Sequence, residues 1–205
     1  MKKVLYTVIL LLSTIAGSGQ TITLNTTGQD PKYVETIKGR AQKIVDGLQL
    51  NDAQKAENVR NIIANRYFLL NDIHSKYDKN QQDALYAELY KHHFELASAL
   101  SLYLTEEQID AVKDGLTYGR LKRDYNAQLE MIPTLTEEEK AQILIWLKEA
   151  REYAMDGSDS KQKHYWFDKY RGRTNNWLSA RGYDLKKERD NWMKRIEQQK
   201  AKQKK

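Results

Sequence analysis

The sequence predicts an all-α protein, an irregular bundle of about six helices followed by a basic C-terminal tail helix. Three observations support this fold class. The 205 residues include only two prolines, apolar residues recur at helical spacing, and helix-capping patterns precede most of the apolar runs. No segment of the sequence alternates apolar and polar residues as a half-buried strand does.

Residues 1–19 predict a secretory signal peptide. Lys2 and Lys3 precede an apolar run from Val4 to Ala16, and small residues at positions 16–19 suit a cleavage site. Because the run is too short to span a bilayer, we expect no stable membrane insertion after cleavage. A lipoprotein anchor needs a cysteine, and the sequence contains none. The predicted location is therefore the periplasm or the exterior.

Residues 20–185 are predicted to form a single helical domain, with residues 186–205 as a basic helical tail. The formal net charge of +6 is concentrated in this tail, which holds nine basic and three acidic residues. Nucleic-acid binding would favour basic residues spread over a folded face. We therefore expect no nucleic-acid partner, and interpret the tail as a solvated helix.

Capping side chains mark the expected helix starts. Asp30 supplies a side-chain acceptor before Pro31, whose missing N–H costs nothing at the first helical position. Thr105 with Gln108, and Thr136 with Glu139, match the capping box, in which each side chain satisfies a backbone N–H of the other. The expected starts in chain order are Asp30, Asn51, Asp78, Thr105, Thr136, residues 158–160 and Asp184.

Between the fourth and fifth of these helices the apolar pattern breaks twice. Gly115 and Gly119 predict a helix end and a tight turn, and Pro133 follows a second break. We expect a turn and a short helix here. A ligand-facing loop around Tyr118 is the alternative interpretation.

The helix predicted over residues 160–182 carries the densest group of aromatic, arginine and amide side chains. At about 100° per residue, His164, Asp168, Arg171 and Asn175 form one polar line, beside a core stripe that includes Phe167 and Trp177. Gly172 lies opposite and predicts a closely packed neighbour. The candidate ligand-binding residues are His164, Trp166, Asp168, Arg171, Arg173, Asn175, Asn176 and Tyr118.

Two interpretations of this helix are open. In the first, the aromatic rings offer an apolar platform, and the arginine and asparagine side chains form hydrogen bonds with a sugar or a carboxylate. In the second, the helix is central and buried, and neighbouring helices satisfy its polar groups. The exposure of the polar line distinguishes the two.

Enzymatic signals in the sequence are weak. Glu88, His92 and Glu95 share a helix face but lack the paired Glu-x-x-His motifs of helical di-iron sites, so no metal and no cofactor are expected. Asp168 or Glu152 could act as a general acid if burial raised its pKa. Whether the protein is an enzyme stays open.

A series of short motifs resembles the secreted bacterial family called domain of unknown function 3826. Thr174 and Trp177 depart conservatively from the expected Ile and Tyr. The resemblance implies an exported all-helical domain in bacteria that often degrade polysaccharides, with no established activity or catalytic residues. The matching motifs are Tyr118-Gly119, Met131-Ile132-Pro133, Glu138-Glu139-Lys140, Ala150-Arg151-Glu152, Ala154-Met155-Asp156, Lys163-His164, Trp166-Phe167, Lys169-Tyr170, Gly172-Arg173, Asn175-Asn176 and Gly182-Tyr183-Asp184.

The preferred functional prediction is a binding or accessory protein in polysaccharide use, with a saccharide or acidic glycan as ligand. A periplasmic chaperone-like stress protein is the second hypothesis, because Leu104-Thr105 with Gln108 matches the Leu-Thr-x-x-Gln signature of small periplasmic chaperones. Helix capping alone also accounts for that pattern. A glycan-active enzyme is the third hypothesis.

Overall fold

The computed structural model describes residues 21–203, so the predicted signal peptide lies outside the described residues. Within this range the protein has nine helices and no strand. The all-α class is confirmed, with more helices than the six and a tail that were expected. The helices are α1 (Pro31–Asp46), α2 (Ala53–Lys76), α3 (Gln82–His92), α4 (Glu95–Ser101), α5 (Glu106–Leu116), α6 (Arg120–Met131), α7 (Glu137–Met155), α8 (Ser160–Ala180) and α9 (Leu185–Gln203).

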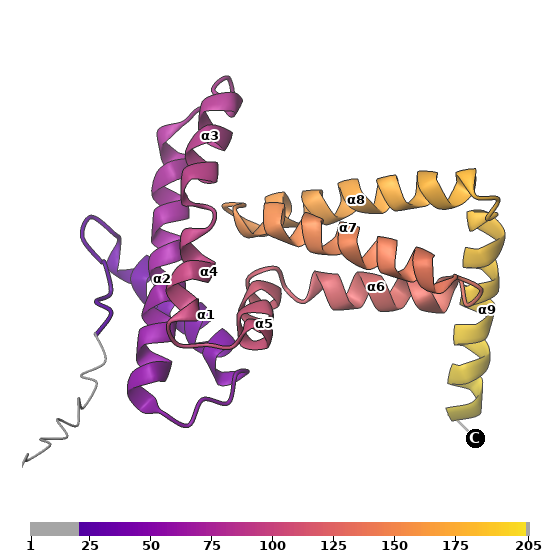
Figure 1. Ribbon diagram of the computed structural model, residues 1–205, viewed down its shortest axis with the longest axis horizontal. Helices are drawn as coiled ribbons and strands as arrows, with labels where there is room; N and C mark the ends of the chain where they lie inside the picture. The colour runs from indigo at the N-terminus through magenta and orange to yellow at the C-terminus, as the bar shows by residue number, and fades with distance from the viewer. Residues whose placement is uncertain (1–20, 204–205) are drawn as a thin grey trace, which may run out of the picture.

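The helices form two bundles that meet at an angle (Figure 1). The N-terminal bundle contains α1 to α5, and a cluster of buried apolar side chains such as Ile37, Ile63 and Leu100 fills it. The C-terminal bundle contains α6 to α8, around a second cluster that includes Ile143 and Phe167. The chain passes from one bundle to the other between α5 and α6, and the end of α7 returns to the N-terminal bundle.

Most predicted caps are confirmed. The Asp30 carboxylate accepts the Tyr33 N–H at 2.9 Å, and both capping boxes, at Thr105 and Thr136, are present. The second helix is capped one residue later than predicted. The Asp52 carboxylate, rather than the Asn51 side chain, accepts the Lys55 N–H at 3.0 Å.

The third predicted helix is two helices. Asp78 does not cap it; the Asp78 carboxylate instead accepts the Asn80 N–H at 2.7 Å in a turn before α3 begins at Gln82. The helical ladder then breaks between α3 and α4 at His93 and Phe94. Apolar spacing continues across the break, which is why the sequence pattern did not reveal it.

The turn predicted around Gly119 is confirmed. Tyr118 and Gly119 are both left-handed, with φ of 59° and 63°, a conformation that costs little for glycine and strains a tyrosine. The helix that follows, α6, has 12 residues and is a full member of the C-terminal bundle rather than a short connection.

The basic tail forms α9, which crosses the far end of α6 and α8 (Figure 1). Arg195 donates from Nη2 to the carbonyls of Glu130 (2.7 Å) and Met131 (3.1 Å), at the C-terminus of α6. A guanidinium at this position satisfies carbonyls that have no helical partner and complements the helix dipole. Across residues 21–203, no helix combines the length and apolar character that a membrane span requires.

Three buried cations lie where the bundles meet. Arg151 of α7 pairs with Asp110 and Asp114 of α5, at 2.6 Å and 2.7 Å. Arg66 of α2, with 5% of its side chain exposed, pairs with Asp156 just after α7. Lys163 of α8 is also buried, and its Nζ donates to the Leu116 carbonyl at 2.9 Å above the ring of Tyr67. Lys163 has no carboxylate partner among these contacts, so burial lowers its pKa to about 8.

Replacement of Lys163 tests this unpaired charge. The pKa of Lys163 in the folded protein, about 8, lies below its ordinary value of 10.5. The unfolded chain therefore binds the proton more tightly, and stability rises with pH between about 8 and 10.5. We expect Lys163→Met to raise the free energy of unfolding at pH 7 by as much as about 3 kcal/mol, the equivalent of that shift. Urea unfolding at pH 7 and pH 9.5 measures it. A wild-type advantage at pH 7 would contradict the prediction.

Removal of the Asp156 carboxylate leaves Arg66 buried without its counter-ion. Because an unpaired buried charge is costly, we expect Asp156→Ala to lower the free energy of unfolding by about 3 to 5 kcal/mol. Asp190→Ala is the matched control, since its 3.2 Å pair with Lys186 is exposed and such pairs contribute about 1 kcal/mol or less. Equal losses in the two variants, measured by urea unfolding, would show that Asp156 has no special structural role.

Candidate functional site

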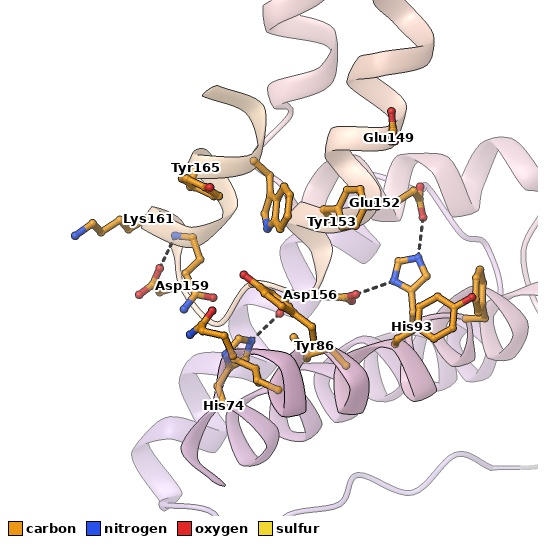
Figure 2. A pocket seen from close by; sticks show the side chains of 18 residues that line it. His74, Tyr86, His93, Glu149, Glu152, Tyr153, Asp156, Asp159, Lys161 and Tyr165 are labelled. Atoms are coloured by element: carbon orange, nitrogen blue, oxygen red, sulfur yellow. Dashed lines mark hydrogen bonds and ion pairs between the residues drawn. The ribbon is translucent and has the colours of Figure 1, made fainter. Parts of the chain in front are cut away.

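A cleft of about 840 Å³ lies between the two bundles. One wall comes from α3 and from the segment that joins it to α4, and the other from the end of α7 and the start of α8 (Figure 2). Its size falls in the range of small-molecule sites, which are often found between structural units. The lining residues are His74, Gln82, Leu85, Tyr86, Leu89, Tyr90, His93, Phe94, Glu149, Glu152, Tyr153, Asp156, Gly157, Asp159, Lys161, Gln162, Tyr165 and Trp166.

Aromatic rings stand on both walls of the cleft. Tyr86, Tyr90 and Phe94 from the N-terminal bundle are 49%, 69% and 63% exposed. On the opposite wall, Tyr153 stacks on Trp166 with ring centroids 4.5 Å apart and an interplanar angle of 18°. Large exposed aromatic side chains gathered in one concave place indicate a binding surface rather than a folding requirement.

The floor of the cleft is polar and centres on Asp156. One carboxylate oxygen pairs with Arg66 and the other lies 2.7 Å from His93 Nδ1. The Asp156 carbonyl is hydrogen-bonded to His74 Nε2 at 2.7 Å. Three side chains of the N-terminal bundle therefore converge on one residue of the C-terminal bundle, as the dashed lines to His74 and His93 in Figure 2 show.

Glu152 lies one helical turn before Asp156 and extends this polar group. Both of its carboxylate oxygens accept from Lys113 Nζ, each at 3.0 Å. Glu152 Oε2 is also 3.7 Å from His93 Nε2. His93 thus has a carboxylate near each ring nitrogen, one in hydrogen-bond contact and one just beyond it.

The local sequence explains the shape of the turn between α7 and α8. Asp159 caps α8 by accepting the Gln162 N–H at 2.8 Å. A side chain at Gly157 would approach Lys163 Cγ at 3.1 Å and the Lys163 N at 3.2 Å. This close approach favours glycine there and lets the chain turn directly from Asp156 into α8.

Of the candidate ligand-binding residues predicted from sequence, only Trp166 lines the cleft; Glu152, named as a possible general acid, lines it as well. Tyr118, His164 and Asp168 gather instead around Arg120 of α6. Arg120 Nη2 donates to Asp168 at 2.9 Å and Nη1 lies 3.2 Å from His164 Nδ1, while the His164 and Tyr118 rings are 5.6 Å apart. These contacts join α6 to α8 on a part of the surface distinct from the cleft lining.

The other candidates are dispersed along α8. Arg173 packs over the Trp146 ring at 4.6 Å and pairs with Glu149 at 3.4 Å, and exposed Arg171 pairs with Asp168 at 3.3 Å. Asn175 is half-buried and Asn176 is exposed. The residues of the polar line therefore differ in exposure. Arg120 of α6 contacts two of them, His164 and Asp168.

The packed neighbour expected at Gly172 is not found. Among the described residues nothing lies within 4 Å of where a side chain at Gly172 would point, so this glycine faces open space. Asp168 is not poised as an acid, because its hydrogen bond from Arg120 lowers the pKa of its carboxyl.

The expected core stripe of α8 is largely confirmed. Phe167, Tyr170, Thr174 and Leu178 are buried and Trp177 is half-buried.

Within residues 21–203 there is no group of three or more His, Cys, Asp or Glu side chains that could hold a metal ion. His92 instead pairs with Glu95 at 2.9 Å.

Several cleft residues were missed by reasoning from sequence. Tyr86, Tyr90 and Phe94 recur every four residues and so share one helical face apart from the buried leucines, a signal that was visible. His93 and Asp156 carried no such signal, because 63 residues separate them. Their contact arises from the way the bundles meet.

Comparison with known proteins supports the resemblance seen in the motifs. Among curated proteins, none matches the chain. The family described as "Protein of unknown function (DUF3826)" matches residues 34–84 and 77–198, which include α2 to α8 and most of α1 and α9. The protein therefore belongs to the DUF3826 family.

Proposed function

We propose that the cleft between the bundles binds a glycan, and that the protein serves as a binding or accessory protein in polysaccharide use. The observation that carries this proposal is the pair of aromatic walls. Tyr86, Tyr90 and Phe94 face the cleft from one side and the stacked Tyr153 and Trp166 from the other. Flat apolar rings with polar edges suit the faces of sugar rings.

The polar groups of the cleft favour an uncharged glycan. Three of its four carboxylates are paired with cations, Glu152 with Lys113, Asp156 with Arg66 and Glu149 with Arg173. The fourth, Asp159, caps α8. The paired carboxylates still accept hydrogen bonds from sugar hydroxyls, while their charge is largely balanced. Among the described residues that line the cleft there is no arginine to bind an acidic sugar.

The chaperone hypothesis has less support. The lining of the cleft is mostly apolar, as a chaperone surface would also favour, but a His, Asp and Glu cluster lies between the aromatic walls. Helix capping at the start of α5 accounts for the Leu-Thr-x-x-Gln pattern that suggested this class. Thr105 and Gln108 form the capping box of α5, with the Thr105 N–H donating to Gln108 Oε1 at 3.2 Å.

Removing one ring from each wall tests the proposal. We expect Tyr86→Ala and Trp166→Ala each to weaken oligosaccharide binding roughly thirtyfold, the equivalent of about 2 kcal/mol. Tyr118→Ala is the matched control, because Tyr118 is an exposed tyrosine outside the cleft lining. Titration calorimetry with xylohexaose, cellohexaose and mannohexaose measures the affinities, and an oligogalacturonate tests the preference for uncharged sugars.

Two results would count against glycan binding. If none of the oligosaccharides binds the wild type or raises its melting temperature, the proposal fails. If one binds but Tyr118→Ala weakens it as much as Trp166→Ala does, the binding site is not this cleft.

A further inference from the structure

The two ring nitrogens of His93 have different surroundings. Nδ1 lies 2.7 Å from Asp156 Oδ2, a short hydrogen bond to a carboxylate. Among the described residues Nε2 has no hydrogen-bond partner, and Glu152 Oε2 lies 3.7 Å from it. His93 and Glu152 both line the cleft, and the Nε2 side of the ring is directed toward Glu152 (Figure 2).

Asp156 determines which nitrogen carries the proton in the neutral ring. A carboxylate accepts hydrogen bonds and does not donate them, so the neutral imidazole has its proton on Nδ1 and its lone pair on Nε2. This is the arrangement in which a carboxylate orients a histidine as a base.

Arg66 reinforces the arrangement. Its Nη2 pairs with Asp156, and its Nη1 donates to the His92 carbonyl at 2.8 Å, directly before His93 in the chain. One buried guanidinium therefore holds both the carboxylate and the backbone that presents the imidazole. Side chains held in this way keep a fixed geometry, as proton transfer requires.

We infer that His93 is a catalytic base and that the cleft hydrolyses ester substituents on its glycan, an inference that rests on the proposed glycan binding. Cleavage of a glycosidic bond normally needs a protonated carboxylic acid beside a carboxylate. The two carboxylates beside His93 are paired with Arg66 and Lys113 instead. Ester hydrolysis, by contrast, can use one group as base and then as acid.

The reaction balances with His93 alone as the proton carrier. Nε2 takes a proton from a water molecule while the water oxygen forms a bond to the acyl carbon. The bond from that carbon to the sugar oxygen then breaks, and the imidazolium returns its proton from Nε2 to the sugar oxygen. The products are a carboxylic acid and a free hydroxyl, so no oxidant, reductant or metal is consumed.

Charged groups surround His93 from several helices. Arg66 and His74 contribute from α2, Lys113 from α5, and Glu152 from α7 with Asp156 following it.

His93→Asn separates catalysis from structure. The asparagine amide is placed to replace Nδ1 as donor to Asp156 but offers nothing in place of Nε2. We expect the variant to keep its fold and to lose acetate release from acetylated xylo-oligosaccharides by about 10² to 10⁴-fold. His92→Asn is the matched control, because the neighbouring His92 side chain pairs with Glu95 outside the cleft.

The outcomes separate this inference from the proposed glycan binding. If the wild type binds oligosaccharides but releases no acetate from acetylated xylan, acetylated glucomannan or 4-nitrophenyl acetate, the cleft binds glycans and the catalytic inference is overturned. Equal activity of His93→Asn and His92→Asn would overturn it as well. If no oligosaccharide binds at all, glycan binding itself has failed.

Discussion

The contact between Asp156 and the N-terminal bundle is the constraint on which the rest of the structure depends. Asp156 uses one carboxylate oxygen for Arg66, the other for His93, and its carbonyl for His74. Since Arg66 is buried, the guanidinium needs a counter-ion in this place. The requirement fixes the end of α7 against α2, and so determines both the angle of the bundles and the existence of a cleft beside their junction.

The elements that local chemistry specifies were predictable from the sequence. Asp30 before Pro31, and Thr105 and Thr136 with their partners three residues later, are true caps because capping depends on neighbours within one turn. Asn51 and Asp78 show the limit of this reasoning. Each was a plausible cap, but the aspartate after Asn51 took its place and Asp78 entered a turn.

The candidate site could be predicted only in part, because a helical wheel describes one helix at a time. The polar line of His164 and Asp168 was correctly placed on one face of α8, but the partner that occupies it, Arg120, comes from another helix. Of the predicted ligand-binding residues, only Trp166 lines the cleft. The two walls of the cleft come from segments at least 55 residues apart in the chain, the separation of Phe94 and Glu149, and at such a separation helical periodicity carries no information.

The passage between the bundles at Tyr118 and Gly119 has a consequence for how the molecule is made. The N-terminal bundle is complete in the chain before the first residue of α6, and domains of this size can acquire structure as units in the order of their synthesis. Until α7 follows, Arg66 has no Asp156 to neutralise it and His93 has no carboxylate to orient it. The cleft can therefore form only after α7 and the start of α8 have been made, and a chain that stops after α5 is a bundle without a site.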